Sequence, residues 1–458
     1  MASDAPPPGD GGDRVTTAPT RTLIVGSGAR EHALAWKLAG EPGMNEVVVA
    51  PGSAAIAAES RVRCLPGVEP LDSGAVVAAA RSMAAELVVV GPEAPLAVGV
   101  VDALQAAGVR TFGPTRAAAR IETSKAFCHD VAEAAGVRMA RGRAFEADEG
   151  AEARAYVAEI GSTGGGVVLK QDGLAAGKGV AVYDDAEEAL EHVASYLEGL
   201  GPGPALVVEE RLAGREASVI AVCDGRDAVA LPASRDHKRL SDGDLGPNTG
   251  GMGAYSPLPD LSDDEVADIL ATVHRPLLAE LAKRGTPFVG FLYAGLMLTD
   301  DGPALLECNA RLGDPEAQVI LPRLAGALGP ILAGAARGQL PRPSPTILPS
   351  SRRAAVGIVL AAAGYPGSPR RGDPIEGLDD ATAAGALVFH AGTLARPGGG
   401  FGTNGGRVLT VIGTGSNLEA ARLEAEAAAD AISWAGQQRR RDIAATVPPA
   451  RVPVGAAS

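Results

Sequence analysis

The stretch VLKQDGLAAGKGVAV, which runs from Val168 to Val182, places a glycine-rich loop between two short apolar runs. Apolar runs of this length on either side of glycines predict two strands joined as a hairpin. The loop glycines allow backbone N–H groups to converge on an anion, and a lysine adds positive charge. These loop residues are Gly173, Gly177, Lys178 and Gly179. The run therefore predicts a phosphate-binding hairpin.

The same run differs from the loop of P-loop nucleotide triphosphatases. That loop requires GxxxxGK followed by Ser or Thr, whose hydroxyl binds magnesium, whereas Gly179 follows Lys178 here. A P-loop enzyme is therefore disfavoured. For this run taken alone, an ordinary hairpin with Lys170 and Lys178 in solvent stays open as the alternative.

Composition excludes several classes of protein. The 458 residues are 46% hydrophobic and carry a net charge of −14, which predicts about three globular domains and argues against non-specific binding to nucleic acid or anionic membranes. The four cysteines are scattered without a CxxC pair, so they indicate neither a zinc site nor a disulfide framework. With no apolar run of membrane-spanning length and no signal-peptide pattern, we expect a cytoplasmic protein.

Alternating strand and helix patterns predict a parallel α/β domain over 21–122. Its first turn, GSGARE, resembles a dinucleotide fingerprint, but Glu31 stands where the third glycine is required. A dinucleotide site is therefore disfavoured, whereas a phosphate at the helix N-terminus after Gly28 remains possible. The preceding residues, 1–20, are rich in Pro and Gly and are expected to form a disordered tail.

The pattern changes after residue 122. Antiparallel-type strands interleaved with helices are expected over 123–344, followed by a proline-rich linker and a small α+β domain over 345–446. A second disordered tail is expected at 447–458. The predicted fold class is thus a multidomain mixture of α/β and α+β architecture.

A candidate metal site lies in the run LLECNARLGDPE. Strand alternation places Glu307 and Asn309 on the same face, two residues apart. A carboxylate and an amide oxygen are hard ligands of the kind that Mg²⁺ prefers, and Arg311 can offer a planar fork to a phosphoryl oxygen. A strand-end turn with exposed polar groups is the alternative for these residues in isolation.

The run SRDHKRLSDGDLGPNTGGMGAYSP, residues 234–257, is expected to be a long loop without regular structure. Such a loop is uncommon in a compact domain unless it serves a site. It carries several charged side chains and closely spaced glycines, which can present donors to a charged ligand.

Taken together, these runs resemble the phosphoribosylamine–glycine ligase family of the ATP-grasp superfamily. The similar runs include GSGAREHALAWKL, VVGPEAPLAVGVVDAL, KQDGLAAGKGV, DHKRLSDGDLGPNTGGMGAYSP and ECNARLGDPE, and the similarity covers about 21–445. The chain departs from the family's form of these runs at Gln171, Cys308 and Leu312, which affects packing and leaves the charged residues in place.

The resemblance implies a reaction and its reactants. The family joins glycine to 5-phosphoribosylamine with ATP through glycyl phosphate, and forms glycinamide ribonucleotide, ADP and phosphate in purine biosynthesis. It implies ATP and Mg²⁺ or Mn²⁺ as cofactors, small-molecule partners only, and a monomer. It also implies an ATP-grasp domain with a mobile lid over about 145–212, which keeps the acyl phosphate from water.

The resemblance also implies roles for individual residues. The residues implied to bind ATP are Lys125, Lys170, Gly173, Gly177, Lys178, Gly179, Glu209, Glu210, Leu212 and Glu216. The residues implied to bind the other substrates are Gly26, Ser27, Gly28, Glu31, Pro92, Glu93, Asp236, Lys238, Arg239, Asn248, Gly251, Arg311, Gly313 and Asp314. Glu307 and Asn309 are the implied metal ligands, and Lys170, Lys178 and Arg311 the implied catalytic residues.

Three other functions are alternatives to this reaction. The nearest is another ATP-grasp carboxylate–amine ligase with a different acid or amine. A non-catalytic nucleotide-binding regulator would need the loss of a metal ligand or a phosphate lysine, and both kinds of residue are present. A dinucleotide-dependent oxidoreductase is disfavoured by Glu31.

Overall fold

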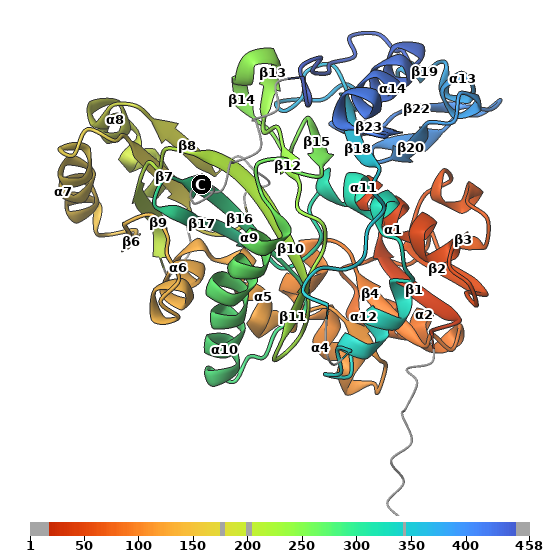
Figure 1. Cartoon of the computed structure of the whole chain (residues 1–458), viewed down its shortest axis with the longest axis horizontal. Helices are drawn as coiled ribbons and strands as arrows, with labels where there is room; N and C mark the ends of the chain where they lie inside the picture. The colour runs from red at the N-terminus through yellow and green to blue at the C-terminus, as the bar shows by residue number, and fades with distance from the viewer. Residues whose placement is uncertain (1–17, 175–178, 198–203, 342–344, 446–458) are drawn as a thin grey trace, which may run out of the picture.

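The computed structural model describes residues 18–174, 179–197, 204–341 and 345–445 (Figure 1). Its first sheet holds five parallel strands in the order β3-β2-β1-β4-β5. The strands are Arg21–Gly26 (β1), Glu46–Pro51 (β2), Val62–Cys64 (β3), Leu87–Val90 (β4) and Thr111–Phe112 (β5). The connecting helices are Ala29–Ala39 (α1), Ile56–Ala58 (η1), Ser73–Ser82 (α2), Glu93–Val98 (α3) and Val100–Ala106 (α4). The prediction of a parallel sheet here is confirmed.

The ordered chain begins before the expected boundary at residue 21. The backbone N–H of Thr20 donates to Glu86 Oε2 at 2.8 Å, so residues 18–20 are part of the folded chain. The rest of the expected N-terminal tail, 1–17, and the expected C-terminal tail, 447–458, lie outside the described residues.

A second, antiparallel sheet forms the centre of the molecule, with strand order β11-β10-β16-β17. Its strands are Arg215–Asp224 (β10), Ala228–Ala230 (β11), Val289–Thr299 (β16) and Gly302–Asn309 (β17). The helices of this part are Arg116–Thr123 (α5), Lys125–Ala134 (α6), Asp263–Ile269 (α9), Leu270–His274 (η3), Arg275–Lys283 (α10), Glu316–Ile320 (α11), Leu321–Arg323 (η4) and Gly329–Ala335 (α12). The central strands are buried because helices pack against them.

A third sheet, with strand order β6-β9-β7-β8, has its own hydrophobic core. Its elements are Gly142–Glu146 (β6), Gly150–Gly161 (α7), Val167–Gln171 (β7), Val180–Tyr183 (β8), Ala186–Leu197 (α8) and Pro204–Glu210 (β9). The strands β7 and β8 pair antiparallel, which confirms the predicted hairpin. Two of its predicted loop residues, Gly177 and Lys178, lie outside the described residues. Figure 1 shows this unit at the end of the molecule farthest from the parallel sheet.

A fourth sheet, β12-β15-β18-β23-β20, joins strands from the middle and the end of the chain. Its strands are Arg235–Asp236 (β12), Gly253–Ser256 (β15), Ala354–Ala361 (β18), Leu387–His390 (β20) and Arg407–Gly415 (β23). A small sheet, β19-β22-β21, lies next to it and consists of Pro374–Ile375 (β19), Thr393–Ala395 (β21) and Phe401–Thr403 (β22). The helices are Leu378–Ala383 (α13) and Leu418–Ala431 (α14).

Two details of the C-terminal part go beyond the sequence patterns. The run ALVFHAGTL forms two strands, β20 and β21, and the chain approaches itself closely between them, since a Cβ at Gly392 would lie 2.6 Å from the Gly405 backbone. The proline-rich linker pairs with the central sheet, since Ala230 N–H donates to Thr346 O and Leu348 N–H donates to Ala230 O. Residues 342–344 lie outside the described residues.

The expectation of an unstructured loop over 234–257 is wrong. This segment forms β12, Arg239–Ser241 (β13), Asp242–Asp244 (η2), Leu245–Asn248 (β14) and β15, and β13 pairs with β14 as a ribbon. The glycines fold the chain back on itself so that backbone groups pair: Met252 N–H donates to His237 O, and Thr249 N–H to Lys238 O. Arg440 anchors the ribbon through an ion pair with Asp244 and a hydrogen bond to Arg239 O, and its neighbour Asp442 accepts from Gly243 N–H.

Candidate functional site

One cavity of about 130 Å³ lies between the β7–β8 hairpin, α6 and the end of β17. Nine of the residues singled out in the sequence line it: Glu93, Lys125, Lys170, Gly173, Gly179, Glu209, Glu307, Asn309 and Arg311. Residues more than 200 positions apart in the chain, such as Glu93 and Asn309, therefore meet in one place. Cationic, acidic and amide groups face the same space, as a polyphosphate and a divalent cation require.

Two lysines approach the cavity from different elements. Lys170, on β7, has its ammonium 2.7 Å from Glu209 Oε2 and donates to Leu306 O at 2.8 Å. Lys125 is the first residue of α6 and donates to Gly173 O at 2.8 Å, and burial lowers its pKa despite the nearby carboxylate of Asp172. A lysine in the first turn opposes the helix dipole, so its position serves the cavity and not the helix.

Glu307 and Asn309 lie on one face of β17, as strand alternation predicts. Lys238 is the main cause that lowers the pKa of Glu307, and Lys170, Arg311 and Lys125 lower it further. The carboxylate is therefore ionised at neutral pH and available as a hard ligand.

The surroundings of these two side chains suit a metal that the nucleotide helps to bind. The described residues contain no group of three or more His, Cys, Asp and Glu side chains that could hold a metal by themselves. Glu307 and Asn309 supply two oxygens, and the octahedral preference of Mg²⁺ leaves the other positions to phosphate oxygens and water.

Arg311 is held by two acidic side chains. Its guanidinium lies 3.3 Å from Glu93 Oε2 and 3.0 Å from Glu122 Oε1. Burial raises the pKa of Glu122, while Ala310 N–H donates to that carboxyl at 2.7 Å. Glu122 thus fixes both Arg311 and the backbone next to Asn309.

Three residues implied to bind the nucleotide are not among those that line this cavity, in the part of the chain that the structure describes: Glu210, Leu212 and Glu216. Glu210 is engaged with Arg141, since its backbone N–H donates to Arg141 O and its carboxylate accepts from Arg141 N–H. Leu212 follows β9 and Glu216 lies on β10. Glu216 pairs with Lys238 at 2.8 Å.

A cluster of charges next to the cavity centres on Lys238. Its ammonium is 2.8 Å from Glu216 Oε2 and 3.6 Å from Glu307 Oε1. Burial favours loss of its proton, but Glu216, Glu307 and Asp236 together raise the pKa of Lys238 above its ordinary value. Burial raises the pKa of Asp236 to about 8, together with the carboxylates of Glu316, Glu216 and Glu307, although Lys238 lowers it.

The glycine-rich turn of the first domain lies at the carboxyl ends of β1 and β4. The strand order reverses between these two strands, which is where open α/β sheets bind ligands. Gly26 ends β1, Ser27 and Gly28 follow it, and Pro92 occupies the N-cap position of α3 after β4.

Glu31 occupies the space that three glycines leave. A Cβ at Gly26 or Gly91 would lie within 2.7 Å of the Glu31 side chain, and Gly28 N–H donates to Glu31 Oε2 at 2.7 Å. The side chain is almost fully buried, and by accepting from Gly28 N–H it caps the N-terminus of α1. The N–H of Gly28 is therefore bonded to Glu31, so an anion at this turn would contact the N–H groups that follow Gly28.

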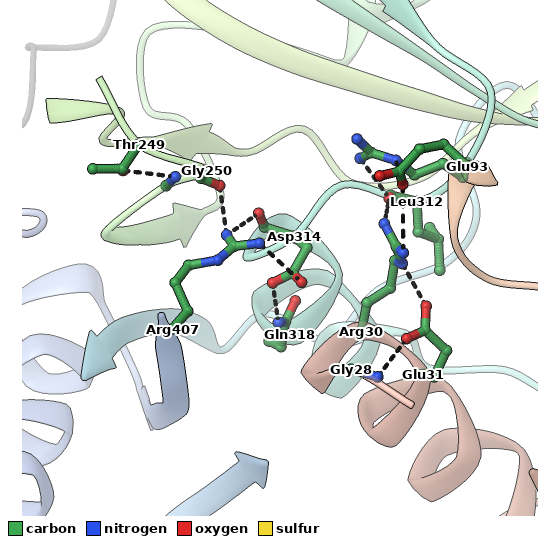
Figure 2. Close-up of polar contacts among 12 residues, drawn as sticks. Gly28, Arg30, Glu31, Glu93, Thr249, Gly250, Leu312, Asp314, Gln318 and Arg407 are labelled. Carbon is green, nitrogen blue, oxygen red and sulfur yellow. Dashed lines mark hydrogen bonds and ion pairs between the residues drawn. The ribbon is translucent and has the colours of Figure 1, made fainter. Parts of the chain in front are cut away.

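The loop that follows β17 connects the cavity with the glycine-rich turn of the first domain (Figure 2). Arg30, from α1, donates to Glu31 at 2.6 Å and to Leu312 O at 3.2 Å, and its guanidinium lies 3.9 Å from Glu93. Asp314 accepts from Gln318 Nε2 at 2.7 Å, and Gly313 packs against Glu316, which a Cβ at Gly313 would meet at 2.4 Å.

The other residues of the expected substrate set belong to the β13–β14 ribbon and its base. Arg239 pairs with Asn248 in the ribbon, and its guanidinium donates to Gly246 O at 2.8 Å. Gly251 has φ +108°, and a Cβ there would lie 2.5 Å from Pro315 Cδ, so the ribbon base packs directly on the loop that follows Asp314.

Three residues that organise the site were not identified from the sequence: Arg30, Glu122 and Arg407. Arg30 lies inside the run GSGAREHALAWKL, and Glu122 lies three residues before Lys125, so proximity to residues already singled out was the available signal. Arg407 begins β23, far from every recognised motif, and no local pattern distinguishes it from a surface arginine.

Comparison with known proteins gives three family-model matches. The N domain of phosphoribosylglycinamide synthetase matches residues 20–122, its ATP-grasp (A) domain residues 123–317, and its C domain residues 355–446. A phosphoribosylamine–glycine ligase of Ralstonia nicotianae is 46% identical over 427 residues, which cover 92% of this chain and 98% of that protein.

Solved structures agree with this result. The phosphoribosylamine–glycine ligase of Thermotoga maritima superposes with a TM-score of 0.72 at 33% identity and covers 92% of this chain and 100% of its own. The biotin carboxylase domain of Hydrogenobacter thermophilus 2-oxoglutarate carboxylase, solved with MgADP and bicarbonate, reaches 0.67 at 16% identity over 92% of each chain, which shows a shared fold alone. From three consecutive domain matches and this level of identity, the chain belongs to the phosphoribosylglycinamide synthetase family.

Proposed function

We propose that this chain is an ADP-forming carbon–nitrogen ligase that joins glycine to 5-phosphoribosylamine and forms glycinamide ribonucleotide, a step of purine biosynthesis. Relatives over nearly the whole chain bear the name of this activity. The observation that carries the proposal is the cavity in which Lys125, Lys170, Glu307, Asn309 and Arg311 converge.

The chemistry explains why these groups are needed. A carboxylate does not acylate an amine at neutral pH, because its oxygen is a poor leaving group. Transfer of the γ-phosphoryl group of ATP to the carboxylate of glycine forms glycyl phosphate and releases ADP. The ribosylamine nitrogen then attacks the acyl carbon, the bond to the phosphate oxygen breaks, and the amine loses a proton. Positioning and charge neutralisation therefore dominate catalysis.

The phosphate-binding role falls to the two lysines and the hairpin loop. Lys125 on α6 and Lys170 on β7 both face the cavity. Each ammonium can exchange its protein oxygen partners for phosphate oxygens. Gly173 and Gly179 stand at the two ends of the loop. The assignments of Gly177 and Lys178 as closing residues rest on the family resemblance.

The metal role falls to Glu307 and Asn309. ATP with Mg²⁺ is the cofactor that the fold supports, since the related biotin carboxylase domain binds MgADP; use of Mn²⁺ is a further proposal. When bound, the ion neutralises charge on the phosphoryl oxygens. Arg311, which is fixed by Glu93 and Glu122, would hold the transferring phosphoryl group from the other side.

The remaining assignments follow the same division. Glu209, Glu210, Leu212 and Glu216 would hold the adenosine part of ATP. The turn at Gly26–Gly28, the Pro92-Glu93 pair, the 313–314 loop and the ribbon base would enclose the ribosylamine and glycine. We further propose domain boundaries near 122 and 344, a lid over about 145–212, and a cytoplasmic location. The described residues contain no helix long and apolar enough to cross a membrane.

The decisive experiment incubates purified protein with ATP, Mg²⁺, glycine and freshly prepared phosphoribosylamine and detects glycinamide ribonucleotide by mass spectrometry. The Glu307→Gln variant should lose most of the activity, about 10²-fold or more, and should need more Mg²⁺. Asp301→Asn is the matched control and should retain activity, because Asp301 is an exposed carboxylate in the turn between β16 and β17. ADP release with a different acid or amine, and none with these, would instead identify another ATP-grasp ligase.

A further inference from the structure

Arg407 lies outside every sequence motif of the proposed site, yet its side chain contacts two of the loops that enclose that site (Figure 2). It is the first residue of β23, in the sheet that contains the C-terminal strands. Its Nη1 donates to Gly250 O and, at 2.6 Å, to Asp314 O, while its Nη2 lies 3.2 Å from Asp314 Oδ2. One guanidinium thus joins β23 to two segments that lie 93 and 157 residues before it in the sequence.

The two loops are shaped to receive this side chain. A Cβ at Gly250 would lie 3.1 Å from Arg407 Cζ, so glycine allows the backbone to lie flat against the guanidinium. The next residue, Gly251, packs on Pro315 with a positive φ that other residues rarely adopt. Gln318 Nε2 donates to the second carboxylate oxygen of Asp314, which leaves Oδ2 directed at Arg407.

The same loop is held from its opposite side by the first domain. Arg30, on α1, donates to Leu312 O at 3.2 Å, two residues before Asp314. Figure 2 shows the two arginines approaching the loop from opposite directions, Arg407 from β23 and Arg30 from α1. The loop between Arg311 and Pro315 is therefore clamped between a residue of each flanking part of the molecule.

We infer that Arg407 is a positioning residue, through which the C-terminal sheet sets the distance between the ribbon base at Gly250–Gly251 and the loop at Gly313–Asp314. This inference rests on the proposed function, in which these two segments enclose phosphoribosylamine. Arg407 is not among the described residues that line the ATP cavity, most of which come from α5, α6, the β7–β8 hairpin and β17. Its loss should weaken the enclosure of the amine and leave the nucleotide cleft intact.

The experiment compares steady-state kinetics of Arg407→Lys, Arg407→Met and Arg353→Met with those of the wild type. Arg353 is the matched control, because it immediately precedes β18 in the same sheet and, among the described residues, its side chain donates to Thr414 and to neither loop of the site. A lysine keeps the charge and the apolar stem but cannot span two carbonyls and a carboxylate with a planar fork. Arg407→Lys keeps the test decisive if Arg407→Met fails to fold.

For Arg407→Lys we expect KM for phosphoribosylamine to rise at least fivefold, and for Arg407→Met at least tenfold, while KM for ATP stays within twofold of wild type. Arg353→Met should change neither KM. An unchanged KM for phosphoribosylamine in folded Arg407→Lys, or an equal rise in both KM values, would overturn the inference. Wild-type protein that makes no glycinamide ribonucleotide would instead refute the proposed function.

Discussion

Lys170 lies on β7 with its ammonium between the carboxylate of Glu209 and the carbonyl of Leu306. Both charged side chains are largely buried. The carbonyl is available because Leu306 forms a bulge in β17: Gly295 pairs with Glu307 and Leu296 with Leu305, so Leu306 has no partner in the ladder. A lysine implied to bind phosphate is thus also one half of a buried ion pair.

We predict that Lys170→Met lowers both activity and stability, and that the two losses can be separated. Activity should fall about 10²-fold or more because phosphoryl charge is no longer neutralised. Stability should fall by about 3–5 kcal/mol, because Glu209 is left buried without its partner. The double variant Lys170→Met/Glu209→Gln should regain most of the stability and none of the activity, as measured by denaturant unfolding and ADP release.

The control for this variant is Lys283→Met. Lys283 is exposed on α10 and pairs with Glu280, which Arg284 also holds, so its loss should cost little stability. If the double variant recovered activity together with stability, Lys170 would be a structural residue only.

Asp236 supplies a prediction about pH. Burial and the carboxylates around it raise the pKa of Asp236 to about 8 in the folded chain, far above about 3.9 for an unfolded aspartate. Between these two values the folded state binds more protons than the unfolded state, so the contribution of Asp236 to stability is present below about pH 4 and is lost as the pH rises through about 8.

The test measures thermal unfolding of wild type and Asp236→Asn between pH 5 and pH 9. The Tm of wild type relative to the variant should fall as the pH rises, because only the wild type must give up the buried proton. A constant difference across this range would show that the carboxyl of Asp236 is already ionised in the folded chain.

At the scale of elements, the β6-β9-β7-β8 sheet and the helices α7 and α8 have a core separate from the two large core clusters. Lys170 and the Asp172-Gly173 corner contact α6 and β17 at the cavity, where Asp172 accepts from Ser124 Oγ and Ala126 N–H. A unit with its own core that meets the rest of the site through polar contacts can move as a body.

We therefore predict that ATP with Mg²⁺ slows amide hydrogen exchange across 145–212. The nucleotide would bridge the lysine on β7 and the metal ligands on β17, and so restrain the unit against the central sheet. Amides of β1 and β4 are the internal control and should exchange at an unchanged rate. Equal exchange in this segment with and without nucleotide would contradict its role as a lid.

At the scale of the whole molecule, the sheets do not follow the order of the chain. The sheet built on β18 and β23 continues into β15 and β12, which come from the segment before α9. His32 of α1 contacts the C-terminal part as well, since its Nδ1 accepts from His390 N–H at 3.0 Å. The site is consequently enclosed by parts of three regions of one chain.

Because one chain supplies every residue of the proposed site, we predict that the protein works as a monomer. Light scattering after gel filtration should give a mass near 46.0 kDa, and specific activity should not change on dilution. A mass near twice this value, with activity lost on dilution, would show that a second copy completes the site.

The sequence by itself determined the features that depend on short-range patterns. Period-two alternation placed Glu307 and Asn309 on one face of β17, apolar runs around glycines gave the β7–β8 hairpin, and alternating strands and helices gave the parallel sheet. Each of these follows from backbone geometry over a few residues.

Only the tertiary structure decided which distant residues meet. The bulge at Leu306, the burial of Glu31 beneath its glycines, the ribbon at 239–248 and the reach of Arg407 to Asp314 depend on how separate segments pack. The physical reason is sequence separation. Local conformational preference sets the face of a strand on which a side chain lies, whereas a contact between residues 93 positions apart depends on the pairing of β23 with β18.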